Sequence, residues 1–84
     1  MSVRLVYFAW VRERIGLSGE EYPLTQSLPA GELAAKLRAL SAGHAEALTD
    51  LSRLRLALNQ QQVGWDALVS PGDELALFPP VTGG

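Results

Sequence analysis

The sequence predicts an α+β domain, in which a mixed sheet of four to five strands carries one main helix packed on one face. Its 84 residues suit a single small domain. Strand-like and helix-like segments follow one another as two strands, one helix, then two or three strands. A helix of ~14 residues and a strand of ~6 residues are both about 20 Å long, so one helix covers one face of such a sheet.

The first strand is predicted over residues 2–10, because SVRLVYFAW is rich in β-branched and aromatic residues. Alternation divides it into two faces, one with Val3, Leu5, Tyr7 and Ala9 and the other with Arg4, Val6, Phe8 and Trp10. Both faces are largely apolar, which favours a strand inside the sheet, covered on both sides or facing a partner on one. A short helical turn ending at Gly16 and a short strand through Tyr22 are expected next.

The main helix is predicted within residues 28–43, LPAGELAAKLRALSAG. Apolar side chains recur at helical spacing on one face, namely Leu33, Ala34, Leu37 and Leu40. Pro29 suits the first turn, and Gly43 is expected to close the C-terminus. His44 is then expected on the surface of a loop, within an irregular segment that holds a turn of helix near residues 45–51.

The C-terminal part predicts further strands. Three leucines alternate with other residues, namely Leu54, Leu56 and Leu58. Turns are expected at residues 59–61 and 70–73, and the last strand at residues 74–78. Pro79 and Pro80 cannot donate to a ladder and therefore stop that strand. The domain is thus expected over residues 1–78 and an extended C-terminal tail over residues 79–84.

Composition excludes several classes of function. The net charge is −2 with scattered basic residues, and no apolar run reaches the ~20 residues of a membrane span, so neither nucleic acid nor membrane is an expected partner. The cytoplasm is the expected location. No cysteine and one histidine leave no metal site, and a domain this small has little room for an enclosed pocket. Phe8 and Phe78 are expected on an uncovered sheet face, which favours a protein partner.

The final residues form an uncharged segment with two prolines and two glycines. Six extended residues reach about 20 Å, the prolines stiffen the start, and Gly83-Gly84 fits a channel too narrow for other side chains. The reactive group at the tip is the Gly84 carboxylate. It is a poor electrophile until an enzyme converts it with ATP into an acyl-adenylate.

These features resemble a known family. The order of elements and the Gly-Gly pair resemble the ubiquitin-like β-grasp carriers. More closely, LVYFAWVRERIG, GEL, LALNQQQV and PGDELALFPPVTGG are similar to the small, sulfur-carrying subunits of molybdopterin synthase. The similarity runs from Val3 to Gly84.

The resemblance implies a function and partners. A ubiquitin-activating-type enzyme would adenylate Gly84, and sulfur from a sulfurtransferase would give a Gly84 thiocarboxylate. Residues Pro80, Val81, Thr82 and Gly83 would enter the large subunit of the synthase, where the thiocarboxylate donates sulfur to cyclic pyranopterin monophosphate and forms the dithiolene of molybdopterin. Two small and two large subunits would assemble, with Phe8, Phe78 and Pro79 at the interface. The chain would bind no cofactor and would be no enzyme by itself.

Three alternatives stay open. A sulfur carrier of the thiamin thiazole type shares the fold and the Gly-Gly pair. A ubiquitin-like modifier would instead join Gly84 to lysines of target proteins. A plain β-grasp interaction domain would carry an inert tail.

Overall fold

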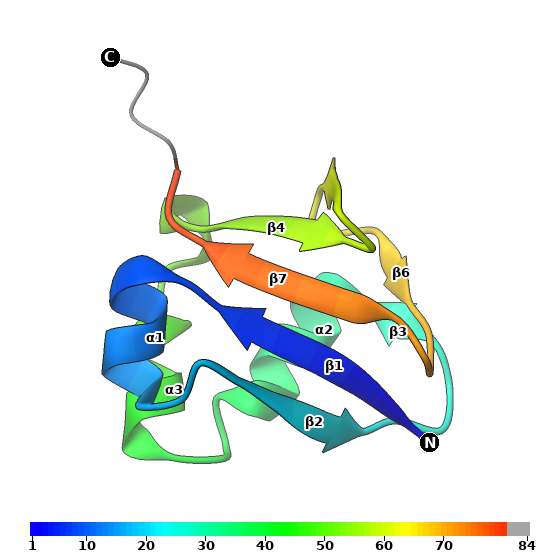
Figure 1. The fold of residues 1–84 in the computed structure, drawn as a ribbon, viewed down its shortest axis with the longest axis horizontal. Helices are drawn as coiled ribbons and strands as arrows, with labels where there is room; N and C mark the ends of the chain where they lie inside the picture. Colours follow the sequence, from blue (N-terminus) through cyan, green and yellow to red (C-terminus); the bar gives the residue numbers. More distant parts are fainter. Residues whose placement is uncertain (81–84) are drawn as a thin grey trace.

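The computed structural model describes residues 1–80, and residues 81–84 lie outside the described part. Its main sheet has five strands in the order β2-β1-β7-β4-β5 (Figure 1). These are β1 (Ser2–Tyr7), β2 (Gly19–Pro23), β4 (Arg55–Leu58), β5 (Gln61–Val63) and β7 (Glu74–Phe78). The β1–β7 pair is parallel and the other pairs are antiparallel, so the sheet is mixed, as predicted. A small second sheet pairs β3 (Leu28–Pro29) with β6 (Leu68–Val69).

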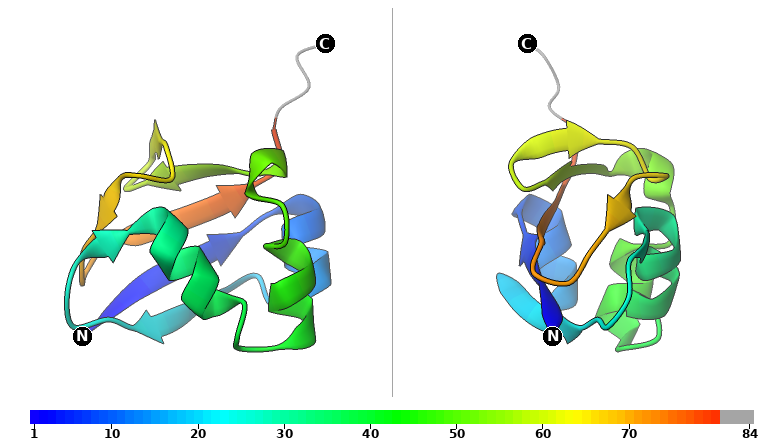
Figure 2. Two further views of the ribbon diagram at one scale, coloured as in Figure 1. Left: turned by 180° about the vertical axis from the view of Figure 1, so that it is seen from behind. Right: turned by 90° about the vertical axis from the view of Figure 1, so that its right-hand side faces the viewer.

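The helical segments are α1 (Ala9–Ile15), α2 (Ala30–Leu37), α3 (Ala42–Ala47) and the short 3₁₀ helix η1 (Leu51–Arg53). The sheet is in front in Figure 1, and α2 and α3 lie behind it; the reverse view in Figure 2 brings them forward. The sequence predicted that one main helix packs on one face of the sheet. That helix is α2, and α3 lies beside it.

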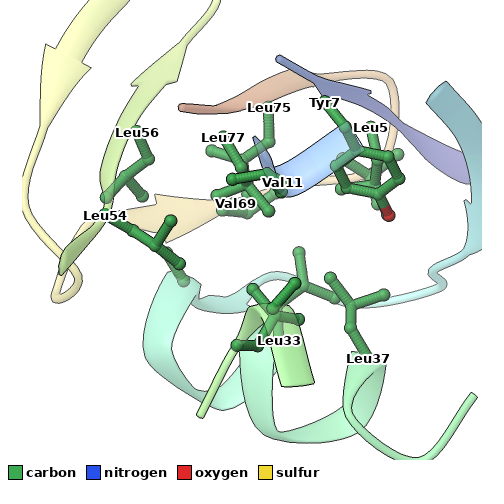
Figure 3. Packing of buried hydrophobic residues seen from close by; sticks show 14 of the residues in the cluster. Leu5, Tyr7, Val11, Leu33, Leu37, Leu54, Leu56, Val69, Leu75 and Leu77 are labelled. Carbon is green, nitrogen blue, oxygen red and sulfur yellow. The ribbon is translucent and has the colours of Figure 1, made fainter. Parts of the chain in front are cut away.

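The hydrophobic core fills the space between the sheet and α2. Leu33 and Leu37 point from α2 toward the side chains of β1 and β7 (Figure 3). The strands contribute alternate residues that are at most 1% exposed: Val3, Leu5, Tyr7, Leu56, Leu75 and Leu77. Truncating one such leucine to alanine costs about 2–5 kcal/mol of stability.

The first strand is shorter than predicted. β1 ends at Tyr7, and Ala9 takes a left-handed conformation with φ of 53°, which ends the alternation and begins α1. Trp10 consequently lies on a helix, where it packs partly buried against the core. The predicted end at Gly16 is confirmed, since this glycine caps α1 with φ of 90°.

The predicted end of the main helix is wrong. α2 stops at Leu37, so Leu40 is 45% exposed instead of lying on the buried face. Ser41 then takes an extended backbone and caps a separate helix, α3. Gly43 lies inside α3, where a Cβ atom would collide with the carbonyl oxygen of Arg14 in α1. This glycine therefore permits close packing of α1 and α3 and does not terminate α2.

The C-terminal strands follow the predicted alternation. Leu54 and Leu56 are buried, and the turn into β5 is made by Asn59 and Gln60, both with positive φ. Asp73 closes the turn before β7, because its carboxylate accepts the backbone N–H of Ser70 at 2.8 Å. β7 ends at Phe78, as predicted.

Candidate functional site

The segment that leads into the tail leaves the sheet from its middle. We call Phe78, Pro79 and Pro80 the tail root. β7 lies between β1 and β4, with Phe78 opposite Arg55, and the backbone N–H of Phe8 donates to the carbonyl of Leu77 at 3.1 Å. Ladder partners on both sides therefore fix the position from which the tail root leaves the domain.

The sheet face opposite the helices carries the residues that alternate with the core; we call it the open face. One row across it joins Val6, Ala76 and Ala57, which are register partners on β1, β7 and β4. All three residues are half-buried and apolar. A second row, toward the N-terminal end of β1, joins Arg4 to its register partners Glu21 and Glu74 and is charged.

The row at the tail root combines aromatic and basic side chains. The backbone of Phe8 is extended like β1 before it, so that the alternation of β1 continues and places this side chain on the open face. The Phe8 side chain is 48% exposed. Phe78 is half-buried and lies opposite Arg55. The Arg55 guanidinium donates to the carbonyl oxygens of Ser52 and Leu54, at 3.3 and 2.9 Å, and is held in place. Two phenyl rings beside a fixed cation are a surface suited to protein contact.

The predicted interface residues thus lie together. Phe8 and Phe78 occur at one end of the open face, and Pro79 and the exposed Pro80 follow Phe78 in the chain. The predicted site residues Val81, Thr82, Gly83 and Gly84 lie outside the described residues. Within residues 1–80 no group of three metal-ligating side chains occurs, and no helix there is both long and apolar enough to span a membrane.

A buried polar network lies on the helix side of the sheet, and it was not predicted from the sequence. His44 is 4% exposed, so the expectation of a surface residue is wrong. Its Nε2 lies 2.6 Å from a carboxylate oxygen of Glu20 on β2, and the Tyr7 hydroxyl donates to the same oxygen at 2.7 Å. Its Nδ1 lies 2.7 Å from the Ser41 hydroxyl, which also accepts the backbone N–H of His44.

The network shifts the pKa values of two of its members. Burial alone would raise the pKa of Glu20, but the hydrogen bonds from His44 and Tyr7 stabilise the carboxylate and lower that pKa below its usual value. Burial raises the pKa of Tyr7, and the hydrogen bond to Glu20 and its negative charge raise it further. These groups join α3 to β1 and β2, so their role is structural. Ser41 three residues before His44 was a local signal of the cap, whereas Glu20 is distant in the chain.

The five-stranded mixed sheet with a helix across one face is the ubiquitin-like β-grasp fold. The sequence matches the family model described as the ThiS family over residues 5–84, so the chain belongs to the ThiS family.

Two curated relatives share nearly the whole length. The chain is 40% identical over 83 residues to the molybdopterin synthase sulfur carrier subunit of Escherichia coli K12, covering 98% of this chain and 99% of that one. It is 30% identical over 82 residues to the protein of the same name from Haemophilus influenzae, with the same coverage.

Solved structures agree with this fold. SAMP1 from Haloferax volcanii matches with a TM-score of 0.72 and 27% identity, and coverage is 100% of both chains. A chain from the complex of subunits 1 and 2 of molybdopterin-converting factor from Helicobacter pylori matches with a TM-score of 0.67, 26% identity and full coverage of both chains.

Proposed function

We propose that this chain is the sulfur carrier subunit of a molybdopterin synthase. The observation that carries the proposal is full-length similarity to two curated sulfur carrier subunits, combined with a β-grasp domain whose central strand leads directly into the FPPVTGG end. The domain supplies recognition and a fixed tail root. The reacting group is the carboxylate of Gly84, which is converted to a thiocarboxylate and donates its sulfur to cyclic pyranopterin monophosphate.

The large subunit of the synthase is the partner that receives the tail. A molybdopterin-converting factor from Helicobacter pylori is a complex of two subunits, and a chain of that complex matches the present fold. In our proposal Phe8, Phe78 and Pro79 pack against the large subunit, and Pro80, Val81, Thr82 and Gly83 enter its active site. The exposed Phe8 and the half-buried Phe78 at the tail root support this arrangement, because accessible apolar surface next to a functional segment marks a contact surface. Two carriers and two large subunits form the complete assembly.

Activation needs two further proteins. An adenylating enzyme uses ATP to convert the Gly84 carboxylate into an acyl-adenylate, and a sulfurtransferase supplies the sulfur that displaces AMP. The carrier itself binds no cofactor in this scheme. It contains no cysteine, so that its sulfur is acquired on the C-terminus and not encoded in the chain. We place these steps in the cytoplasm.

Intact-mass spectrometry tests this function. Protein produced together with its activating enzyme and sulfurtransferase should show the mass gain of one oxygen replaced by sulfur, and a variant lacking Gly84 should not. Adding the purified thiocarboxylate form to the large subunit and the precursor should give molybdopterin. Gly83→Ala should slow that transfer, because a methyl group widens the segment that enters the channel. Molybdopterin formation by the variant lacking Gly84 would contradict the mechanism.

A protein modifier is the second candidate. The fold matches SAMP1, and solved structures of that name are described as small archaeal modifier protein 1. A modifier would leave a Gly-Gly remnant on lysines of other proteins after proteolysis. Finding such remnants in cells, with no thiocarboxylate on the carrier, would favour this function over sulfur transfer.

A further inference from the structure

A hollow lies at the end of the domain where the tail root leaves, between α1, α3 and η1. It is lined by Trp10, Arg14 and Arg53, with Glu46 and Asp50 on the α3 side. Trp10 follows Phe8 by two residues, and Arg53 precedes Arg55 by two. Phe8 and Arg55 flank the end of β7 through the ladder. The hollow therefore lies at the same end of the domain as the tail root, where Figure 2 shows α1, α3 and η1.

Two guanidinium groups are held at one aromatic ring in this hollow. The Cζ atoms of Arg14 and Arg53 lie 5.8 and 5.6 Å from the centre of the Trp10 ring, within the range of cation–π contacts. Two like charges near one ring repel each other unless an anion lies between or beside them. The ring thus holds a pair of cations in position before any partner arrives.

Within residues 1–80 the acidic residues of the hollow form no direct ion pair with these cations, although the hydrogen bonds from Ser52 and, less strongly, the charge of Arg53 lower the pKa of Asp50. Among residues 1–80 the ion pair within 4 Å is His44 with Glu20, and neither arginine of the hollow has a carboxylate at that distance. Asp50 instead uses one carboxylate oxygen to accept the backbone N–H and the hydroxyl of Ser52, which caps η1. The guanidinium N–H groups consequently stay available for an external acceptor.

This chemistry fits a carboxylate on a protein surface. A guanidinium matches a carboxylate with two parallel hydrogen bonds, and its stacking on tryptophan reduces the freedom that is lost on binding. Tryptophan and arginine are also the residues that most often dominate the energy of protein interfaces. The position beside the tail root points to the protein that receives the tail.

We propose that the hollow of Trp10, Arg14 and Arg53 binds an acidic side chain of the large subunit, and that the interface extends around the tail root from the open face to α1 and η1. The proposal rests on the proposed function for the identity of that partner. The acidic contact would orient a carrier of net negative charge during encounter and would be sensitive to salt.

The test measures association of the unmodified carrier with the purified large subunit by stopped-flow fluorescence or surface plasmon resonance. Arg14→Glu and Arg53→Glu should each slow association about threefold to tenfold at ~50 mM salt, and the difference should largely disappear at ~500 mM. Arg53→Gln should give a smaller effect in the same direction. Lys36→Glu changes the net charge by the same amount on the exposed side of α2 and should have little effect. Thermal melting checks that each variant is folded.

Equal association rates for the Arg14, Arg53 and Lys36 variants at ~50 mM salt would overturn the proposal. A reduction of the association rate that is equally large at high salt would also overturn the proposal, because it would indicate a packing defect. Failure of the proposed function is seen separately, as absence of a thiocarboxylate on wild-type protein. The binding measurement uses the unmodified chain and does not depend on that step.

Discussion

Replacing His44 by alanine is expected to lower the free energy of unfolding by about 3–5 kcal/mol. The hydrogen bond from Nε2–H to the Glu20 carboxylate joins a buried ring to a charged acceptor, and such bonds contribute about 1.5–3 kcal/mol. The bond to the Ser41 hydroxyl adds about 1 kcal/mol, and the edge-to-face contact with the Tyr7 ring, with centroids 6.3 Å apart, adds up to about 1 kcal/mol. The space left by the imidazole adds to the loss.

Urea unfolding at pH 7, followed by circular dichroism, measures this change. For a domain of this size the expected loss corresponds to a melting temperature lower by about 15–30 °C. Glu46→Ala on the exposed side of the same helix is the matched control and should change stability by less than about 0.5 kcal/mol. A loss below about 1 kcal/mol for His44→Ala would refute the reasoning, since it would mean that the three contacts behave like surface contacts.

The same network predicts how stability depends on pH. The pKa of Glu20 is lowered in the folded protein, so the unfolded chain takes up its proton first as the pH falls below about 4.5. The contribution of Glu20 is therefore complete above that pH and is lost as the pH falls through the lowered folded pKa. Glu20→Gln should remove this part of the acid sensitivity. The measurement covers roughly pH 6 to pH 3, which spans the usual pKa of a glutamate. Stability curves of wild type and Glu20→Gln that run parallel over this range would contradict the assignment.

Three further changes test other parts of the molecule. Gly43→Ala should lower the free energy of unfolding in urea by about 2–4 kcal/mol, because the new methyl group collides with the backbone oxygen of Arg14. Gly31→Ala in α2 is the control. Its methyl group lies at an ordinary 3.5 Å from the backbone oxygen of Trp65, so that this change should be neutral or slightly stabilising. Tyr7→Phe should remove a loss of stability above pH 10, since the raised pKa of this phenol keeps the folded form protonated while the unfolded form ionises. Phe78→Asp should weaken binding to the large subunit at least about tenfold, as measured by calorimetry, because Phe78 is proposed to lie at the centre of the interface. An unchanged affinity would show that Phe78 lies outside the interface.

The parts of the fold that were predictable depend on residues close in sequence. Alternation placed Leu54 and Leu56 inside because neighbouring side chains on a strand point to opposite faces. The same rule put Phe8 and Phe78 on the open face. The end of α2 was not predictable in this way, because Leu40 continues the apolar spacing although the Ser41 cap has already started another helix.

The burial of His44 needed information that no local pattern carries. Its partner Glu20 lies on β2, and the two meet only after α3 has packed against the sheet. Gly43 shows the same limit. A glycine after a helix is typical of a C-cap, and only the approach of α1 shows that this one is needed for interhelical packing.

In our proposal, stability and recognition depend on opposite faces of the main sheet, and this separation can be measured. Tyr7 points to the helices and joins the His44 network, while Phe8, the next residue, follows the open face beside the tail root. His44→Ala should therefore lower the melting temperature yet bind the large subunit normally well below it. Phe78→Asp should show the reverse, with weak binding and a nearly unchanged melting temperature. If His44→Ala also loses affinity while fully folded, the network positions the tail root through β1, and the two roles are coupled.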